Sequence, residues 1–338
     1  GLNLLPLVRF DDPFEIIAHL MVGSEGTLAF LAGVTMRTER EYEHKASAMV
    51  YFSDIGEASR AVVEMRKLQD AAGERIVHSA EMLDRKSLAS VGDTTGEGLT
   101  ALLTETKAHT PEELAANVAR IGELLGRFAL YVPARFTDDP AEQAKFWALR
   151  SGIFPAVGGS RPAGTTCLIE DVAFHIGDLP RATAELQALI ARHGYDDACI
   201  YGHALEGNYH FIINQSFSTP AEAARYEALM DDVAELVVGR YDGSLKAEHG
   251  TGRNMAPFLR REWGDAACAV MRAVKELFDP AGLLNPGVIF NDDPRCHLSH
   301  FKPLPLTDPL IDRCIECGFC EVNCLTCGLT LSSRQRIV

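Results

Sequence analysis

Strand-like and helix-like segments alternate along the middle of this chain of 338 residues, and this alternation most limits the folds that it can adopt. Short runs rich in β-branched and aromatic residues predict strands, whereas longer segments with apolar residues every three or four positions predict helices. The mixture predicts an α/β sandwich of the α+β class, with helices covering one face of a sheet. The predicted strands span 48–52, 99–104, 129–136, 165–174, 198–204 and 209–214, and the predicted helices 55–72, 111–127, 138–150, 178–193, 219–239 and 265–278.

Several of the predicted helices begin at capping sequences. Thr110 precedes Pro111 and two glutamates, and Thr219 precedes Pro220 in the same way. A hydroxyl at the cap with proline and acids in the first turn is typical of a helix N-terminus. The chain shows no internal sequence repeat. Beyond residue 279 prolines become frequent and predict an extended linker (280, 286, 294, 303, 305 and 309).

The composition excludes several classes of protein. Apolar residues make up 47% and charged residues 23%, as in ordinary globular domains, and the length allows two or three of them. A net charge of −15 disfavours binding to nucleic acid or to an anionic lipid surface. No apolar run approaches the roughly 18 residues of a transmembrane helix. We therefore expect a cytoplasmic protein without a membrane span, with peripheral attachment to the inner face of the membrane left open.

The strongest chemical signal is a cysteine run near the C-terminal end, which reads CIECGFCEVNC over residues 314–324. Its CxxCxxCxxxC spacing predicts a [4Fe–4S] cluster, in which three cysteines bind one cluster and the fourth reaches a second one. A zinc knot is the alternative, but it favours two separated CxxC pairs. Cys327 or Cys296 could supply a further ligand. The predicted cluster ligands are Cys314, Cys317, Cys320 and Cys324.

A second signal is a pair of histidines around a predicted hairpin turn. If Glu206 and Gly207 form a two-residue turn, His203 lies directly opposite His210, close enough for both imidazoles to hold one metal ion. A polar cross-strand pair is the simpler interpretation. Glu248, beside His249 and two glycines, would complete a three-ligand site with an open position, and a solvated loop is the alternative for Glu248 and His249.

A third signal is the short glycine-rich segment 23–27, which reads GSEGT after an apolar run. Its backbone N–H groups could contact a phosphate or a planar cofactor. It lacks both the GxGxxG pattern of dinucleotide-binding folds and the GKS/T of a P-loop, so a tight turn is an equal alternative.

These segments together resemble one family. They read HLMVGSEGTLAF at 19–30, GHALEGNYH at 202–210, EHGTGRN at 248–254 and FDPAGLLNPG at 278–287, followed by the cysteine run. In this order, over nearly the whole chain, they resemble the FAD-linked D-2-hydroxyacid dehydrogenases of the vanillyl-alcohol-oxidase (PCMH) superfamily. The branch they resemble most carries a flavin part fused to a ferredoxin-like iron–sulfur part, and is usually labelled D-lactate or D-2-hydroxyglutarate dehydrogenase.

The resemblance implies roles for matching residues. Arg150 matches the arginine that grips the substrate carboxylate, and His249 matches the proposed general base. Glu170 and Asp171 match an acidic pair whose role is open. The matching divalent-metal ligands are His203, His210 and Glu248, and the matching cofactor-binding residues are Gly23, Ser24, Glu25, Gly26, Thr27, Asn285, Pro286 and Gly287.

The resemblance also implies an organisation. Residues 1–43 match the end of a PCMH-type FAD-binding domain, residues 44–290 a C-terminal substrate or cap domain with ferredoxin-like βαβ units, and residues 291–338 a linker and the start of an α-helical [4Fe–4S] domain. The first FAD subdomain and the rest of the iron–sulfur domain are expected outside this sequence. Where the family commonly has GDG this chain has LEG at 205–207, so local hydrogen bonding should differ there.

The implied activity is oxidation of D-lactate, D-2-hydroxyglutarate or a similar D-2-hydroxy acid to the 2-oxo acid. The implied cofactors are FAD, a divalent ion (Zn, Mn or Fe) and a [4Fe–4S] cluster. Electrons would pass to a quinone, a cytochrome or an electron-transfer flavoprotein, and a homodimer is compatible with this scheme. A glycolate-oxidase-like subunit and a non-catalytic iron–sulfur electron-transfer module are the alternatives.

Overall fold

The computed structural model describes residues 1–93, 99–302 and 304–338, so Pro303 of the predicted linker lies outside the described part. The described residues form two compact units. Unit 1 contains residues 1–40, 171–173 and 231–301, and unit 2 contains residues 41–170, 174–230 and 302–338. The predicted domain boundaries at 43 and 290 stay a prediction.

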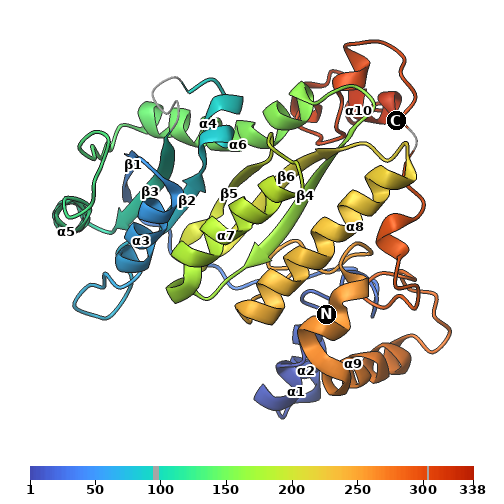
Figure 1. The fold of residues 1–338 in the computed structure, drawn as a ribbon. Helices are drawn as coiled ribbons and strands as arrows, with labels where there is room; N and C mark the ends of the chain where they lie inside the picture. The colour runs from blue at the N-terminus through green and yellow to red at the C-terminus, as the bar shows by residue number, and fades with distance from the viewer. Residues whose placement is uncertain (94–98, 303) are drawn as a thin grey trace. The chain divides into compact units, whose positions relative to one another are not determined.

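A sheet is the centre of unit 2 (Figure 1). Within the described residues it has six strands in the order β1-β3-β2-β5-β6-β4. β1 pairs with β3, β3 with β2, β2 with β5 and β5 with β6, all antiparallel. The strands are β1 (His44–Phe52), β2 (Ser79–Leu83), β3 (Thr100–Ala108), β4 (Thr166–Ala173), β5 (Cys199–His203) and β6 (Asn208–Gln215).

The strand order shows a structural repeat that the sequence does not. β1, a helix, β2 and β3 form one half of the sheet, and β4, a helix, β5 and β6 form the other. In each half the third strand lies between the other two, and the halves join where β2 pairs with β5. The helices in question are α3 (Ile55–Met65) and α7 (Leu179–Arg192).

Helices lie on both faces of the sheet, so the prediction of one covered face is incomplete. α3 and α7 pack on one face, where the buried Tyr209 hydroxyl lies 3.5 Å from Ser59 Oγ of α3. The other face carries α4 (Arg85–Ser90) and α6 (Pro140–Ser160). There Leu88 and Ile153 pack with Tyr201 in an apolar cluster. Side chains alternate along each strand, so both faces have apolar surface that helices can bury.

Of the remaining helices, α5 (Pro111–Leu125) and α8 (Pro220–Ala234) lie where the sequence predicts them, and α10 (Ser333–Ile337) was not predicted. α5 begins with a capping box, in which Thr110 and Glu113 bond to each other's backbone N–H. α8 begins in unit 2, whereas its last residues and the π-helical turn that continues it, Glu235–Arg240, belong to unit 1. α10 follows the cysteine run.

Unit 1 is built from α1 (Pro6–Arg9), α2 (Pro13–Leu20), α9 (Leu259–Phe278) and the turns around them. α9 has a kink at Gly264, whose φ of 71° lies in the left-handed region. Leu20, Leu28, Met271 and Ile289 are buried together and hold the N-terminal helices against α9. Burial of these side chains is the main stabilising contribution within this unit.

Several sequence predictions need correction. Residues 129–136 are not a strand, and only single bridges link Leu130 to Phe52 and Thr137 to Ser47. Pro133 explains this, since it lacks the N–H that a strand needs. The helix predicted over 138–150 extends to Ser160, through Pro155. β2 and α4 were not predicted, because the apolar run of β2 is short and is interrupted by Glu81.

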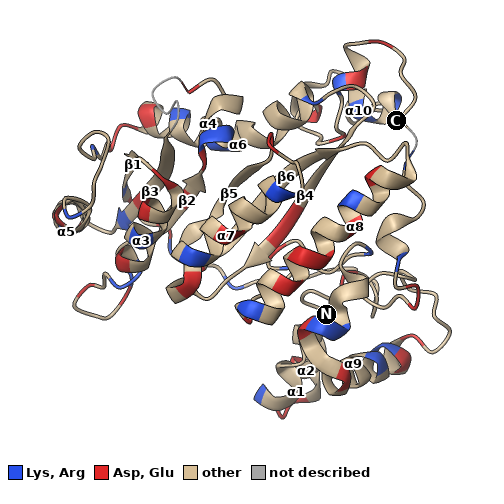
Figure 2. Cartoon of the chain, in the orientation of Figure 1, with Lys and Arg blue, Asp and Glu red and all other residues tan. Residues whose placement is uncertain are grey.

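No helix within the described residues is both long and apolar enough to span a membrane. Acidic and basic residues are interspersed along α7 and α8, as Figure 2 shows.

Candidate functional site

The two predicted histidine ligands share one face of the sheet in unit 2, but in a different register from the prediction. β5 and β6 pair Tyr201 with His210, so His203 is not directly opposite His210. The connection is longer than two residues, because 204–206 form a 3₁₀ turn that ends at Gly207 with φ of 73°. The register differs by two residues, which preserves the face of each side chain. His203 and His210 are therefore diagonal neighbours, with ring centroids 5.4 Å apart.

Glu81 of β2 is the residue that organises this face, and sequence reasoning missed it. It pairs directly with His203 across the joint between β2 and β5. Its Oε1 lies 2.7 Å from His203 Nδ1, and its Oε2 accepts a hydrogen bond of 2.9 Å from Arg150 Nε. Burial alone would raise the pKa of Glu81, but the hydrogen bond from His203 and the charge of Arg150 hold that pKa below its ordinary value.

The Glu81 contact determines how His203 can bind a metal ion. A carboxylate at Nδ1 favours the tautomer in which the N–H points at Glu81 and Nε2 carries the lone pair. Carboxylates commonly support metal-binding histidines in this way. The donor chemistry of His203 therefore fits a divalent ion.

Arg150 lies on α6 over the same face of the sheet. Its guanidinium stacks on Tyr201, with 5.1 Å from Cζ to the ring centroid, and its side chain is 19% exposed. The Glu81 hydrogen bond uses Nε, and among the described residues no hydrogen bond engages either Nη group. A guanidinium held at one nitrogen can offer its outer edge to a carboxylate.

In unit 1, Glu25 joins two of the sequence segments. Its Oε1 accepts a hydrogen bond of 2.7 Å from Thr251 N, and its Oε2 accepts one of 2.7 Å from Gly252 N. Glycine is favoured at position 250, because its φ of 83° lies in the left-handed region and a Cβ would lie 2.8 Å from Glu25 Oε1. Glu25 itself has φ of 53° in a tight turn. The segment 23–27 and the segment 248–252 are therefore fixed to each other.

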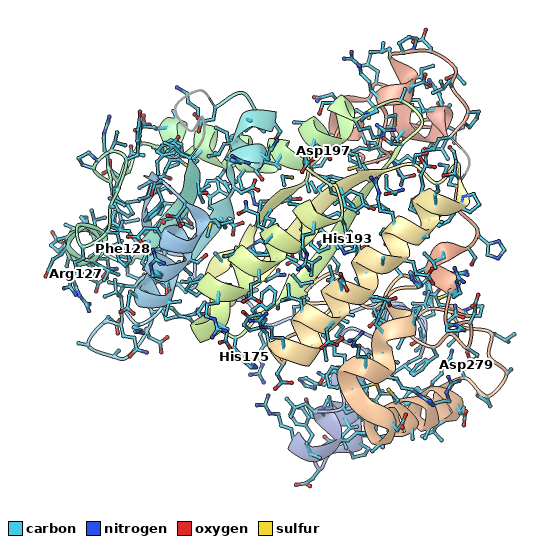
Figure 3. The ribbon with its side chains drawn as sticks, viewed as in Figure 1. Arg127, Phe128, His175, His193, Asp197 and Asp279 are labelled. Atoms are coloured by element: carbon cyan, nitrogen blue, oxygen red, sulfur yellow. The ribbon has the colours of Figure 1, made fainter. Side chains whose placement is uncertain are left out.

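The segment 278–287 joins the same cluster. Asn285 Nδ2 donates to Glu25 O at 2.6 Å. Asp279, at the end of α9 and labelled in Figure 3, accepts backbone hydrogen bonds from Leu283 and Leu284. The Lys275 ammonium beside Asp279 helps to lower the pKa of Asp279 to about 2. Three segments far apart in sequence thus meet in unit 1.

The turn 23–27 has the features of a cofactor-contacting loop as well as of a tight turn. Thr27 Oγ1 donates to Ser24 O at 2.7 Å, so this hydroxyl closes the turn itself. Gly23 has φ of 77°, and a Cβ there would meet no atom of the described residues within 4 Å. This backbone is open to a planar group, so the turn fits the FAD that the sequence implies.

The charge of Glu25 should stabilise unit 1. In Glu25→Gln, one carboxylate oxygen becomes an amide that cannot accept a hydrogen bond, so one of the N–H groups of Thr251 and Gly252 loses its acceptor. We expect a loss of about 1.5–3 kcal/mol in unfolding free energy, measured by denaturant titration. Glu15→Gln, at a half-exposed carboxylate of α2, is the control and should change it by less than about 0.5 kcal/mol. Equal effects of the two variants would contradict this role.

Asp171 shapes the turn that carries the predicted base. Its Oδ2 accepts hydrogen bonds from the backbone N–H groups of Glu248 at 2.6 Å and His249 at 2.7 Å. The neighbouring Glu170 accepts instead from the buried Tyr226 hydroxyl at 3.0 Å. The two acidic residues of β4 therefore have different partners: Asp171 accepts from backbone N–H groups, and Glu170 accepts from a tyrosine hydroxyl. The sequence alone assigned no role to either.

The cysteine segment lies in unit 2 as a series of turns before α10. All of its thiols are free; Cys314 and Cys324 are half-buried, and Cys317 and Cys320 are exposed. A hydrogen bond from Thr326 is the main cause that lowers the pKa of Cys324 to about 6. Reduced thiols in turns, one of them inclined to the thiolate form, are a donor set that fits an iron–sulfur cluster.

The structure thus assigns the predicted residues to two sets. Arg150, His203, His210 and the cluster cysteines belong to unit 2, and the residues of the three joined segments belong to unit 1. The predicted metal site needs His203 and His210 from one unit and Glu248 from the other, and it stays a prediction. At the departure from the family pattern, Glu206 forms ion pairs with Arg66 and Arg75.

Comparison with known proteins gives relatives that are named as oxidases or dehydrogenases. The chain is 29% identical over 282 residues to the glycolate oxidase subunit GlcD of Escherichia coli (strain K12), covering 82% of this chain and 54% of that protein. It is 27% identical over 284 residues to a D-2-hydroxyglutarate dehydrogenase of Stutzerimonas stutzeri, with coverages of 81% and 58%. It is 25% identical over 283 residues to a mitochondrial D-lactate dehydrogenase [cytochrome] of Arabidopsis thaliana, with coverages of 80% and 47%. The chain spans about half the length of these curated relatives.

Solved structures share the fold at low sequence identity. An alkyldihydroxyacetonephosphate synthase matches with a TM-score of 0.53 at 15% identity, covering 82% of this chain and 50% of that one. A 4-ethylphenol oxidase from Gulosibacter chungangensis matches with a TM-score of 0.52 at 13% identity, with coverages of 74% and 55%. A family model described as "FAD linked oxidases, C-terminal domain" matches residues 41–289. Because that match covers well over half of the chain, this protein belongs to the FAD-linked oxidase family and contains its C-terminal domain.

Proposed function

We propose that the whole protein oxidises a D-2-hydroxy acid, such as D-lactate or D-2-hydroxyglutarate, to the 2-oxo acid with FAD as the cofactor. Cys314, Cys317, Cys320 and Cys324 would hold a [4Fe–4S] cluster, which would supply the route for electrons to a quinone, a cytochrome or an electron-transfer flavoprotein. The family and the names of the relatives support the reaction class. The cysteine spacing and the free thiols support the cluster.

One observation carries the proposal most directly: Glu81 links Arg150 and His203 on one sheet face. A 2-hydroxy acid presents a carboxylate next to a hydroxyl. Arg150 offers the guanidinium edge for the carboxylate, and the imidazole of His203 is oriented beside it by the same glutamate. Because Arg150 and His203 are both bonded to Glu81, they can hold the substrate carboxylate and the neighbouring C2 hydroxyl in one orientation.

The residues of the chain then have separate tasks. Arg150 binds the substrate carboxylate, and the imidazole of His249 accepts the proton of the 2-hydroxyl. Asp171 holds the backbone of Glu248 and His249 in place. His203, His210 and Glu248 would hold a divalent ion, which lowers the pKa of the 2-hydroxyl. FAD, held by residues 23–27 and 285–287, would supply the acceptor for the hydride on C2 as the hydroxyl proton goes to His249.

The test uses the whole protein with FAD bound, mixed anaerobically with a panel of acids. D-lactate, D-2-hydroxyglutarate, their L-enantiomers and glycolate are compared by the bleaching of the flavin absorption band. The proposal expects bleaching by a D-acid and none by its L-enantiomer. No bleaching by any acid of the panel would refute it.

Glycolate is the second candidate substrate, because a glycolate oxidase subunit is among the relatives. Glycolate has no substituent on C2 beyond its hydroxyl and carboxylate, so it needs the arginine anchor but no side-chain pocket. Bleaching by glycolate faster than by either larger D-acid would favour this alternative.

A further inference from the structure

The C-terminal end of α6 holds the start of the cysteine segment. Arg161, the residue that follows α6, donates hydrogen bonds to three consecutive backbone carbonyls: Nη1 to Arg313 O at 3.1 Å, and Nη2 to Asp312 O at 3.1 Å and Cys314 O at 3.0 Å. Cys314 is the first cysteine of the predicted cluster motif. One guanidinium therefore fixes the backbone on both sides of the point where the motif begins.

Arg161 is itself held before it reaches the segment. Its Nε donates to Thr165 O at 2.8 Å, and its Nη1 also donates to Gly158 O at 2.8 Å. A planar fork fixed in this way loses less conformational freedom per contact than a flexible ammonium would. The turn between α6 and β4 therefore holds the Arg161 guanidinium in position; we call this guanidinium, with its contacts to residues 312–314, the clamp.

Gly158 provides the matching surface. It is buried on α6, and Ile315 packs where a Cβ would be, with Ile315 Cγ2 2.8 Å from that position. Cys167 Sγ lies 3.3 Å from the same point. The next residue, Gly159, would meet no atom of the described residues within 4 Å if it carried a Cβ. A Cβ would therefore clash at Gly158 but not at Gly159.

We propose that Gly158 and Arg161 form a docking seat that fixes residues 311–315 to the helix that carries Arg150. Segments that join domains move relative to each other unless a specific interface restrains them. Here the restraint is a charged donor on three carbonyls together with close packing of Ile315 on a glycine. Arg150 and Gly158 are eight residues apart on α6, about 12 Å along the helix axis. The seat ties the first cluster cysteine to the helix of the substrate-binding arginine.

By fixing Cys314, the seat would also hold the cluster in position to receive electrons from the flavin; this role rests on the proposed function, whereas the docking itself does not. The docking is tested in the whole protein by hydrogen exchange of the amides of Asp312 and Cys314, which donate to Asp308 O and Ile311 O. In Gly158→Ala, the added methyl displaces Ile315, and we expect these amides to exchange about tenfold faster. Gly159→Ala is the control, because it brings the same gain in helix propensity without the clash.

A second variant tests the clamp without changing packing on Gly158. Arg161→Lys keeps the positive charge but has one nitrogen in place of the three that donate to five backbone carbonyls, so we expect the same acceleration of exchange. Unchanged exchange in both Gly158→Ala and Arg161→Lys would overturn the docking seat. Equal acceleration in Gly159→Ala would do the same, since it would show a general loosening of α6.

The electron-transfer role has its own readout. In Gly158→Ala, reduction of the flavin by substrate should be unchanged, whereas the following reduction of the cluster, observed in its own absorption and EPR signals, should become slower. Normal cluster reduction together with loosened docking would remove this role from the seat. Failure of every substrate to reduce the flavin would instead refute the proposed function and leave the exchange result standing.

Discussion

Replacing His249 by alanine in the whole protein should slow flavin reduction by the D-2-hydroxy acid roughly 10²- to 10⁴-fold, because the proton of the 2-hydroxyl would lose its acceptor. FAD should remain bound, since the turn that carries His249 is fixed by backbone hydrogen bonds to Asp171 that do not use the imidazole. The measurement is anaerobic stopped-flow reduction of the flavin under saturating substrate.

The control for this variant is His19→Ala, at an exposed histidine of α2 in the same unit. It should leave the rate unchanged. Added imidazole should restore part of the activity of His249→Ala, which a purely structural defect would not allow. A rate close to that of the unmutated protein, without imidazole, would remove His249 from the mechanism.

Replacing Glu81 by glutamine should weaken the divalent metal site roughly 10- to 100-fold, the range usual for carboxylates that support a metal-binding histidine. Glutamine keeps the size of the side chain but loses the charge shared by Arg150 and His203. We also expect a raised KM, because Arg150 would be less well oriented for the substrate carboxylate. Metal content after dialysis against a graded chelator gives the affinity, with His210→Ala as the reference for complete loss.

Glu105→Gln is the matched control. Glu105 is a buried carboxylate on the same face of the same sheet, but it accepts hydrogen bonds from Ser47 and Trp147. Glu105→Gln should lower the free energy of unfolding without changing the affinity for the metal ion. Similar metal loss in both variants would show that any buried charge on this face matters, and would contradict a specific role for Glu81.

The depressed pKa of Glu81 also sets the pH range in which this arrangement is stable. The folded-state pKa lies below the ordinary value of 4.5, so the charged form is favoured by folding. Its contribution to stability is therefore complete above about pH 5 and is lost as the pH falls through the lowered pKa. Loss of activity on acidification from pH 7 to pH 5 should therefore arise from groups other than Glu81 itself.

The sequence predicted the face of the histidine pair correctly although it predicted the wrong register. The error was two residues, and side chains in a strand alternate with a period of two, so His203 and His210 still share a face. A turn of 3₁₀ form at 204–206 is not encoded by any strong turn signal beyond Gly207. The sequence therefore predicts that the two histidines lie on the same face of the sheet, but not which residue each of them pairs with.

Glu81 could not be found from the sequence for a different reason. Glu81 lies in a five-residue strand whose neighbouring strands are far away in the chain. Its two hydrogen-bond partners, Arg150 and His203, come from α6 and β5. Asp171 was noticed, but only the fold reveals that it binds the backbone of Glu248 and His249. Local patterns predict elements and candidate side chains, whereas the bonds between candidates depend on long-range pairing.

The sheet of unit 2 consists of two similar halves, and the seam between them is where Glu81 meets His203. Met82 opposite Gly202 and Leu83 opposite Tyr201 complete the paired residues of that seam. The carboxylate–imidazole contact thus forms only after both halves have assembled and docked in the right alignment. A newly made chain would acquire this chemistry late, and catalytic competence would report that the halves have joined.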